Sequence, residues 1–245
     1  MGVLTQFLAQ KDRQLAAVEI DKESIEYLTT NLVHPSGVLA AAPPISPLTS
    51  HPSPLTIIQA DFLRMDLTQL FSGKQFVLTG NYPYDISSQI FFKMLDNRDL
   101  IPCCTGMIQH EVALRLAATP GTKAYGILSV LIQAYYNVEY LFTVEPSVFN
   151  PPPKVQSAVI RMTRNDTKDL GCNEQLFRQV VKTTFNQRRK MLRVSLRQML
   201  PQTAIDQLQS SPSIDLTRRP EQLTLSEFVQ LTNAVQQLSP EARHQ

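Results

Sequence analysis

Four consecutive residues, Asn81-Tyr82-Pro83-Tyr84, combine hydrogen-bond acceptors with a flat aromatic side chain at the predicted end of a strand. The Asn81 side-chain oxygen can accept one proton of an amino group, and the Tyr82 backbone carbonyl can accept the other. Pro83 restricts the backbone of Tyr82 and so aims that carbonyl. Tyr84 offers a face on which an extruded nucleobase can stack.

These groups suit chemistry on the exocyclic amine of an adenine. The lone pair of adenine N6 is delocalised into the ring, so its attack on a methyl sulfonium requires that the pair be localised. Two oxygen acceptors that hold the amine protons favour the positive charge that develops on N6. No general base with a tuned pKa is required. The alternative interpretation is that the four residues only form a turn after a strand.

Alternating strands and helices are expected to position these residues. The patterns predict a helix near the start of the chain, followed by strands at 15–20, 55–60, 75–80, 105–109, 137–144 and 156–162, and by helices at 22–33, 86–96, 110–118 and 124–136. This alternation is typical of an α/β fold with a largely parallel sheet. Residues 34–54 hold six prolines and no Asp, Glu, Lys or Arg, which predicts a loop of low complexity.

The pattern changes after about residue 165. Residues 173–199, 203–209 and 221–237 have helical patterns, and Pro201, Pro212 and Pro220 separate them. We therefore expect an α/β domain over 1–165 and a small all-α domain over 166–245.

Three further residues lie at predicted strand ends, where open α/β sheets bind their ligands. Glu19 ends one strand and suits the two hydroxyls of a ribose. Asp61 follows the next strand and can accept a hydrogen bond from an exocyclic amine. Phe149 precedes the last strand. Acids at strand ends also serve as turn or N-cap residues, and Phe149 can equally be a core residue.

Composition excludes several classes of protein. The chain has 245 residues and a formal charge of +2, with 43% hydrophobic residues, as expected of a globular protein. Three cysteines form no C-x-x-C pair and four histidines show no metal-ligand spacing, so neither a zinc site nor a disulfide framework is indicated. We find no apolar run that predicts a membrane span and no signal peptide, and we expect a protein of the reducing cytoplasm.

Three separated runs carry a family resemblance: NYPYDISSQ at 81–89, AYGILSVLIQAYY at 124–136 and VFNPPPKVQSAV at 148–159. Together they resemble the ribosomal RNA adenine dimethyltransferase family. The resemblance implies a Rossmann-like methyltransferase sheet with a small helical C-terminal domain, and S-adenosylmethionine as cofactor. It implies N6-dimethylation of two adjacent adenosines in the 3′-terminal hairpin of small-subunit ribosomal RNA, on a 30S assembly intermediate. We expect a monomer.

The resemblance also assigns roles by matched motif. Glu19 is expected to hold the cofactor ribose, and Asp61 to meet the cofactor adenine amine. Asn81 is expected between the methyl donor and the target base. Tyr84 is expected to stack on the target adenine, with Phe149 near its other face.

A basic run near the C-terminus fits an RNA partner. Between positions 178 and 200 there are seven basic residues and no acid: Arg178, Lys182, Arg188, Arg189, Lys190, Arg193 and Arg197. Such a patch can neutralise phosphates. The alternative is a solvated helix face.

The sequence departs from the family pattern at its start. Gly2-Val3-Leu4-Thr5 resembles the tail of a glycine-rich turn whose preceding strand is central to the family's sheet. We expect the natural protein to be longer, and two strands that would flank the absent one to have unpaired edges. Two other functions stay open: a catalytically impaired RNA-binding assembly factor, and an adenine N6-methyltransferase acting on another nucleic acid.

Overall fold

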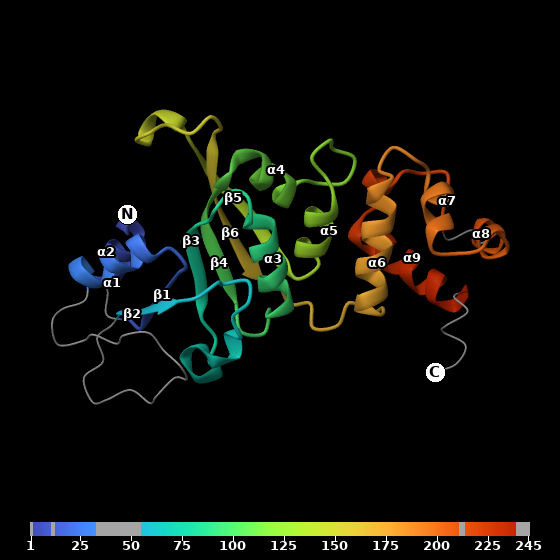
Figure 1. Ribbon diagram of the computed structural model, residues 1–245. Coiled ribbons are helices and arrows are strands. Elements are labelled where there is room, and N and C mark those ends of the chain that lie inside the picture. Colours follow the sequence, from blue (N-terminus) through green and yellow to red (C-terminus); the bar gives the residue numbers. More distant parts are fainter. Residues whose placement is uncertain (1, 11–12, 33–54, 211–213, 239–245) are drawn as a thin grey trace.

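The computed structural model describes residues 2–10, 13–32, 55–210 and 214–238 (Figure 1). The Pro-rich stretch 34–54 lies outside these residues. The strands are β1 Leu15–Glu19, β2 Leu55–Gln59, β3 Val77–Asn81, β4 Cys103–Gln109, β5 Tyr136–Val144 and β6 Ser157–Arg164. The helices before β6 are α1 Val3–Ala9, α2 Lys22–Leu32, α3 Ser87–Asp96, α4 His110–Ala117 and α5 Ile127–Gln133, with short 3-10 helices η1 Leu67–Gly73 and η2 Pro146–Val148.

The strands form two sheets. β1 and β2 pair in parallel, and the other four have the order β3-β4-β6-β5. In the second sheet β3, β4 and β5 run in one direction and β6 alone is reversed, so the expectation of a largely parallel sheet holds with this one exception. The connection 145–156 contains only the short η2 and no α-helix, which is the usual crossover between parallel neighbours. Among the described residues β1, β2, β3 and β5 each pair on one side only, so the pairing does not single out the two open-edged strands that the sequence led us to expect.

One apolar core lies between the four-stranded sheet and the helices that cover it. In α3, Ile90, Phe91, Met94 and Leu95 are buried, which is the spacing of one helical face. Cys104 and Ile108 of β4 are fully buried on the facing side of the sheet. This core positions the carboxyl ends of β3 and β4, where the candidate residues lie.

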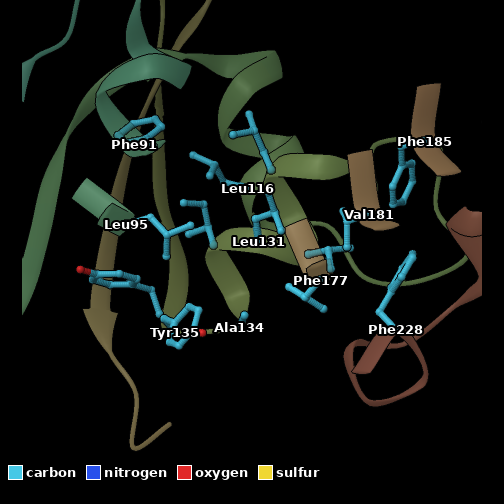
Figure 2. Packing of buried hydrophobic residues seen from close by; sticks show 14 of the residues in the cluster. Phe91, Leu95, Leu116, Leu131, Ala134, Tyr135, Phe177, Val181, Phe185 and Phe228 are labelled. Atoms are coloured by element: carbon cyan, nitrogen blue, oxygen red, sulfur yellow. The ribbon is translucent and has the colours of Figure 1, made fainter. Parts of the chain in front are cut away.

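The C-terminal region is helical, as predicted. It comprises α6 Glu174–Asn186, α7 Leu192–Ser195, η3 Leu196–Gln198, α8 Gln202–Gln209, η4 Pro220–Gln222 and α9 Leu225–Leu238. Figure 2 shows that the core continues from α3 and α5 into this region, where Phe177, Val181, Phe185 and Phe228 pack together.

The predicted continuous helix over 173–199 is wrong, because α6 ends at Asn186 and α7 begins at Leu192. The backbone N–H of Leu192 donates to the Arg218 carbonyl, and that of Arg193 donates to the Leu216 carbonyl. These amides bond to a distant segment instead of to the preceding turn. The polar run Asn186–Lys190 also offers no apolar residue to extend the buried face of α6.

No helix of the described residues is long and apolar enough to cross a membrane. Cys103, Cys104 and Cys172 are free thiols. In the described part of the chain no group of His, Cys, Asp and Glu side chains could hold a metal ion.

Candidate active site

Asn81 is the last residue of β3 and lies opposite Met107 of β4. Its side chain is exposed at the carboxyl end of the sheet. The N–H of the following residue, Tyr82, donates to the Met107 carbonyl at 3.0 Å. Pairing with β4 therefore continues one residue beyond the strand and fixes the backbone around Asn81.

Tyr82 anchors the segment in the core. Its ring packs edge-on against Phe91, with ring centroids 5.5 Å apart. The ring occupies a slot that two glycines leave open: a Cβ on Gly106 would lie 2.6 Å from the Tyr82 ring, and one on Gly80 would lie 3.3 Å from it. The Tyr82 hydroxyl donates to the Thr105 carbonyl at 3.1 Å.

The slot that holds Tyr82 is uncharged. The Tyr82 hydroxyl also lies 3.2 Å from the Cys104 Sγ. Burial raises the pKa of Tyr82 well above its usual value and raises the pKa of Cys104 to about 12. Both groups therefore stay protonated at neutral pH, and they act here as a packed anchor rather than as an acid or base.

Tyr84 is half-buried and bonds across the sheet. Its hydroxyl lies 2.5 Å from the Oγ of Ser157, the fully buried first residue of β6. The Tyr84 carbonyl accepts a hydrogen bond from Ser87, the first residue of α3, at 3.4 Å. Among the described residues no other aromatic ring and no cation packs on the face of Tyr84.

Phe149 lies on the β5–β6 connection, directly after η2, and is half-buried. The base of this connection is closed by Gln156, whose Nε2 donates to both carboxylate oxygens of Glu145 at 3.0 Å. Figure 1 shows the connection extending beyond the same end of the sheet that α4 follows. Within the described part of the chain, Phe149 and Tyr84 form no ring-to-ring contact.

Glu19 and Asp61 follow the carboxyl ends of β1 and β2, and both act locally as turn residues. Glu19 Oε1 accepts hydrogen bonds from the N–H groups of Ile20 and Asp21, at 2.8 and 3.0 Å. Asp61 Oδ1 accepts from the Leu63 N–H at 2.9 Å, and its Oδ2 lies 3.4 Å from the Arg64 Nε. Since a carboxylate has about four acceptor positions, this local role leaves capacity for a ligand.

The two acids lie on a different sheet from Asn81. The connection after β2 joins the sheets, since Phe62, Leu63 and Met65 pack against the main core. Lys93 of α3 donates to the Leu63 and Met65 carbonyls, at 2.9 and 2.5 Å. The structure thus brings Asn81 and Tyr84 together on one segment, and it ties the connection that carries Asp61 to α3.

Sequence reasoning missed the polar groups that follow β4. A hollow of about 220 Å³ at this edge is lined by Gln109, His110, Glu111, Val155 and Gln156. The His110 N–H donates to the Gln156 carbonyl, which joins the two walls of the hollow. The rule that ligands bind at carboxyl strand ends pointed to this position. No local signal identified Ser157, because its partner is 73 residues away.

The basic run is divided between pairing and exposure. Arg178 pairs with Asp96, Arg188 pairs with Glu221, and the Lys182 Nζ lies 5.7 Å from the centroid of the Phe92 ring. The lack of acids within the run therefore does not mean a lack of counter-charges, which the fold supplies from elsewhere. The other four side chains are exposed and form no ion pair with the described residues: Arg189, Lys190, Arg193 and Arg197.

Solved structures with this fold include a dimethyladenosine transferase from Plasmodium falciparum, with a TM-score of 0.68 at 20% identity, covering 94% of this chain and 84% of that one. The 23S rRNA methyltransferase ErmE has a TM-score of 0.63 at 21% identity, covering 96% of this chain and 86% of that one. The architecture is therefore a methyltransferase α/β fold with a C-terminal helical region.

Sequence comparison gives much closer relatives. Ribosomal RNA small subunit methyltransferase A of Bacteroides thetaiotaomicron is 60% identical over 237 residues, which are 97% of this chain and 80% of that protein. The protein of the same name from Flavobacterium johnsoniae is 46% identical over 96% of this chain and 82% of its own length. The family model described as ribosomal RNA adenine dimethylase matches residues 1–237. The chain belongs to the ribosomal RNA adenine dimethylase family.

Proposed function

We propose that this chain transfers methyl groups from S-adenosylmethionine to N6 of two adjacent adenosines in the 3′-terminal hairpin of small-subunit ribosomal RNA. The observation that carries the proposal is the placement of Asn81 at the exposed carboxyl end of β3, on a backbone anchored by the buried Tyr82. The identity of 60% to a small-subunit methyltransferase supports the choice of substrate.

The residues proposed to bind the target base, Asn81, Tyr82, Tyr84 and Phe149, have separate roles. The Asn81 side-chain oxygen and the Tyr82 carbonyl accept the two N6 protons, so the lone pair of N6 is localised for attack and the developing positive charge is stabilised. The ring of Tyr84 stacks on the extruded base. Phe149 approaches the same base from the β5–β6 connection.

The two carboxylates on the proposed cofactor side of the site, Glu19 and Asp61, fit S-adenosylmethionine. Glu19 is partly exposed, as is Asp61, and each retains acceptor capacity beyond its turn bonds. The Glu19 carboxylate would hold the ribose hydroxyls, and the Asp61 carboxylate would accept from the adenine amine. S-adenosylmethionine, when bound, supplies an electrophilic methyl group.

The exposed basic residues of the helical region suit the phosphates of the RNA. We propose a division at residue 165, with the sheet region 1–165 carrying the chemistry and 166–245 contacting RNA. The setting would be the cytoplasm, with a monomer acting on a 30S assembly intermediate.

Methylation of 30S particles that lack the dimethyladenosines tests this function. Wild-type chain should incorporate label from S-adenosylmethionine into two adjacent adenosines, identified by mapping the modified nucleotides. Asn81→Ala should abolish transfer and leave RNA binding largely intact. The matched control is Asn137→Ala, which removes an exposed amide at the start of β5, far from the carboxyl strand ends.

The alternative functions give different results. A chain that binds the 30S particle but does not bind S-adenosylmethionine in a titration would be an RNA-binding assembly factor. Label in another RNA, or at other adenosines, would indicate a different nucleic acid substrate. Near-normal turnover of Asn81→Ala would overturn the assignment of the target-base pocket.

A further inference from the structure

The hydrogen bond between Tyr84 and Ser157 joins two parts of the candidate site that are far apart in sequence. Tyr84 belongs to the segment after β3, and Ser157 begins β6, directly after the connection that carries Phe149. The 2.5 Å separation of the two oxygens is at the short end of the range for hydroxyl pairs.

Ser157 is held on both sides by the sheet. It lies opposite Gln109 of β4 and opposite Val144 of β5, so neighbouring strands fix its backbone. Its side chain is fully buried. The adjacent residue Gln156 is also fixed, by its side-chain bonds to Glu145 and by the His110 N–H. The Ser157 oxygen is therefore a rigid reference point at the edge of the site.

A bond at this point orients Tyr84 without covering it. A phenol oxygen lies on the long axis of its ring, so its hydrogen bond restrains the direction of that axis and does not itself cover either face of the ring. In the described part of the chain no aromatic ring or cation packs on those faces. The side chain is half-buried, so part of it stays accessible although its hydroxyl is tied into the sheet.

We propose that Ser157 is a positioning residue for the transfer reaction, which holds the ring of Tyr84 in the place from which it stacks on the target base. The bond also joins that ring to β6, the strand that follows the connection carrying Phe149. This inference rests on the proposed stacking role of Tyr84. A bond that only stabilised the fold would leave base stacking unchanged when it was removed.

An RNA hairpin with 2-aminopurine at the target adenosine reads stacking directly, because the fluorescence of this base is quenched when it stacks on an aromatic ring. The set of variants is Ser157→Ala, Tyr84→Phe, the double variant and Tyr84→Ala. Ser129→Ala is the control, since Ser129 is an equally buried hydroxyl in α5 that bonds the Arg115 carbonyl. It should lower the melting temperature and leave quenching at the wild-type level.

Ser157→Ala and Tyr84→Phe should reduce quenching equally, and the double variant should resemble either single one. Each should lower kcat by about 3- to 10-fold, the worth of one neutral hydrogen bond. The dissociation constant for the RNA should stay within about twofold, since phosphate contacts dominate affinity.

Three outcomes would count against Ser157. Wild-type quenching in Ser157→Ala, while Tyr84→Ala abolishes quenching, would overturn the positioning role and leave the role of Tyr84 intact. Additive losses in the double variant would mean that Ser157 acts independently of the Tyr84 hydroxyl. Full quenching in Tyr84→Ala would overturn the stacking role itself, and the inference with it.

Discussion

Gly106→Ala should destabilise the sheet at the point where it holds the segment Asn81–Tyr84. Gly106 of β4 lies opposite Gly80 of β3 and has a φ of +153°. A Cβ at this position would lie 2.1 Å from the Gly80 carbonyl oxygen and 2.6 Å from the Tyr82 ring. Non-bonded carbon contacts are optimal at about 3.5–4.0 Å, so the two strands would have to move apart.

The two contributions can be estimated separately. Overpacking of a well-filled site costs about 1–3 kcal/mol. A side chain on an unfavourable backbone conformation costs about 1–3 kcal/mol more. We therefore expect a loss of about 2–6 kcal/mol, a large part of the roughly 5–15 kcal/mol that stabilises a typical domain.

The matched control is Gly171→Ala. Gly171 also has a positive φ, of +78°, but a Cβ there would meet no atom within 4 Å. The control therefore carries the backbone strain without the steric clash. Urea unfolding followed by far-UV circular dichroism gives both free energies. The reasoning would be refuted if Gly106→Ala lost no more stability than Gly171→Ala.

Three other perturbations test the remaining interactions. Arg98→Ala removes an ion pair in which one guanidinium nitrogen donates to both Glu174 carboxylate oxygens, and it removes the cation over the Tyr135 ring. The variant should lower the free energy of unfolding by about 1–3 kcal/mol in urea titrations; an unchanged midpoint would count against this estimate. Alanine at the four exposed basic positions should weaken RNA binding; these positions are Arg189, Lys190, Arg193 and Arg197. The slope of log K against log salt concentration should become shallower by about one unit for each phosphate that is no longer neutralised. An unchanged slope would mean that the RNA binds elsewhere. The hydrogen bond from Arg218 lowers the pKa of Glu227 below its usual 4.5, so the ionised pair contributes stability above that pH and loses it as the pH falls through the folded-state pKa. The stability difference between wild type and Glu227→Gln should shrink over this range, and a constant difference would contradict the assignment.

The sequence predicted the secondary-structure elements whose ends are determined by neighbouring residues. β2 begins at Leu55 as expected, and β3 ends at Asn81 within one residue of the prediction, because an apolar run stops at a polar residue. The carboxyl-end rule then gave Glu19, Asp61 and Asn81 as candidates. The helical C-terminal region was predicted from its period and its prolines.

What could not be predicted depends on residues far apart in the chain. The break after Asn186 arises from backbone bonds to Leu216 and Arg218, and no pattern near residue 190 indicates it. Arg178 pairs with Asp96, which lies 82 residues away in the sequence. Counting acids within the basic run therefore overestimated the number of unpaired positive charges. The reversed direction of β6 goes with the lack of an α-helix between β5 and β6, which the alternating pattern did not reveal.

The division of the strands into two sheets has a consequence for ligand affinity. Glu19 and Asp61 follow one sheet and Asn81 ends the other, and the Lys93 bonds to Leu63 and Met65 help to set the distance between them. A ligand that contacts both sheets gains interactions with each of them. Part of that binding free energy is used to hold the two sheets in one relative position. For the proposed cofactor, Lys93 would therefore contribute to affinity by preorganisation, because its bonds hold the connection after β2 against α3 before any ligand arrives.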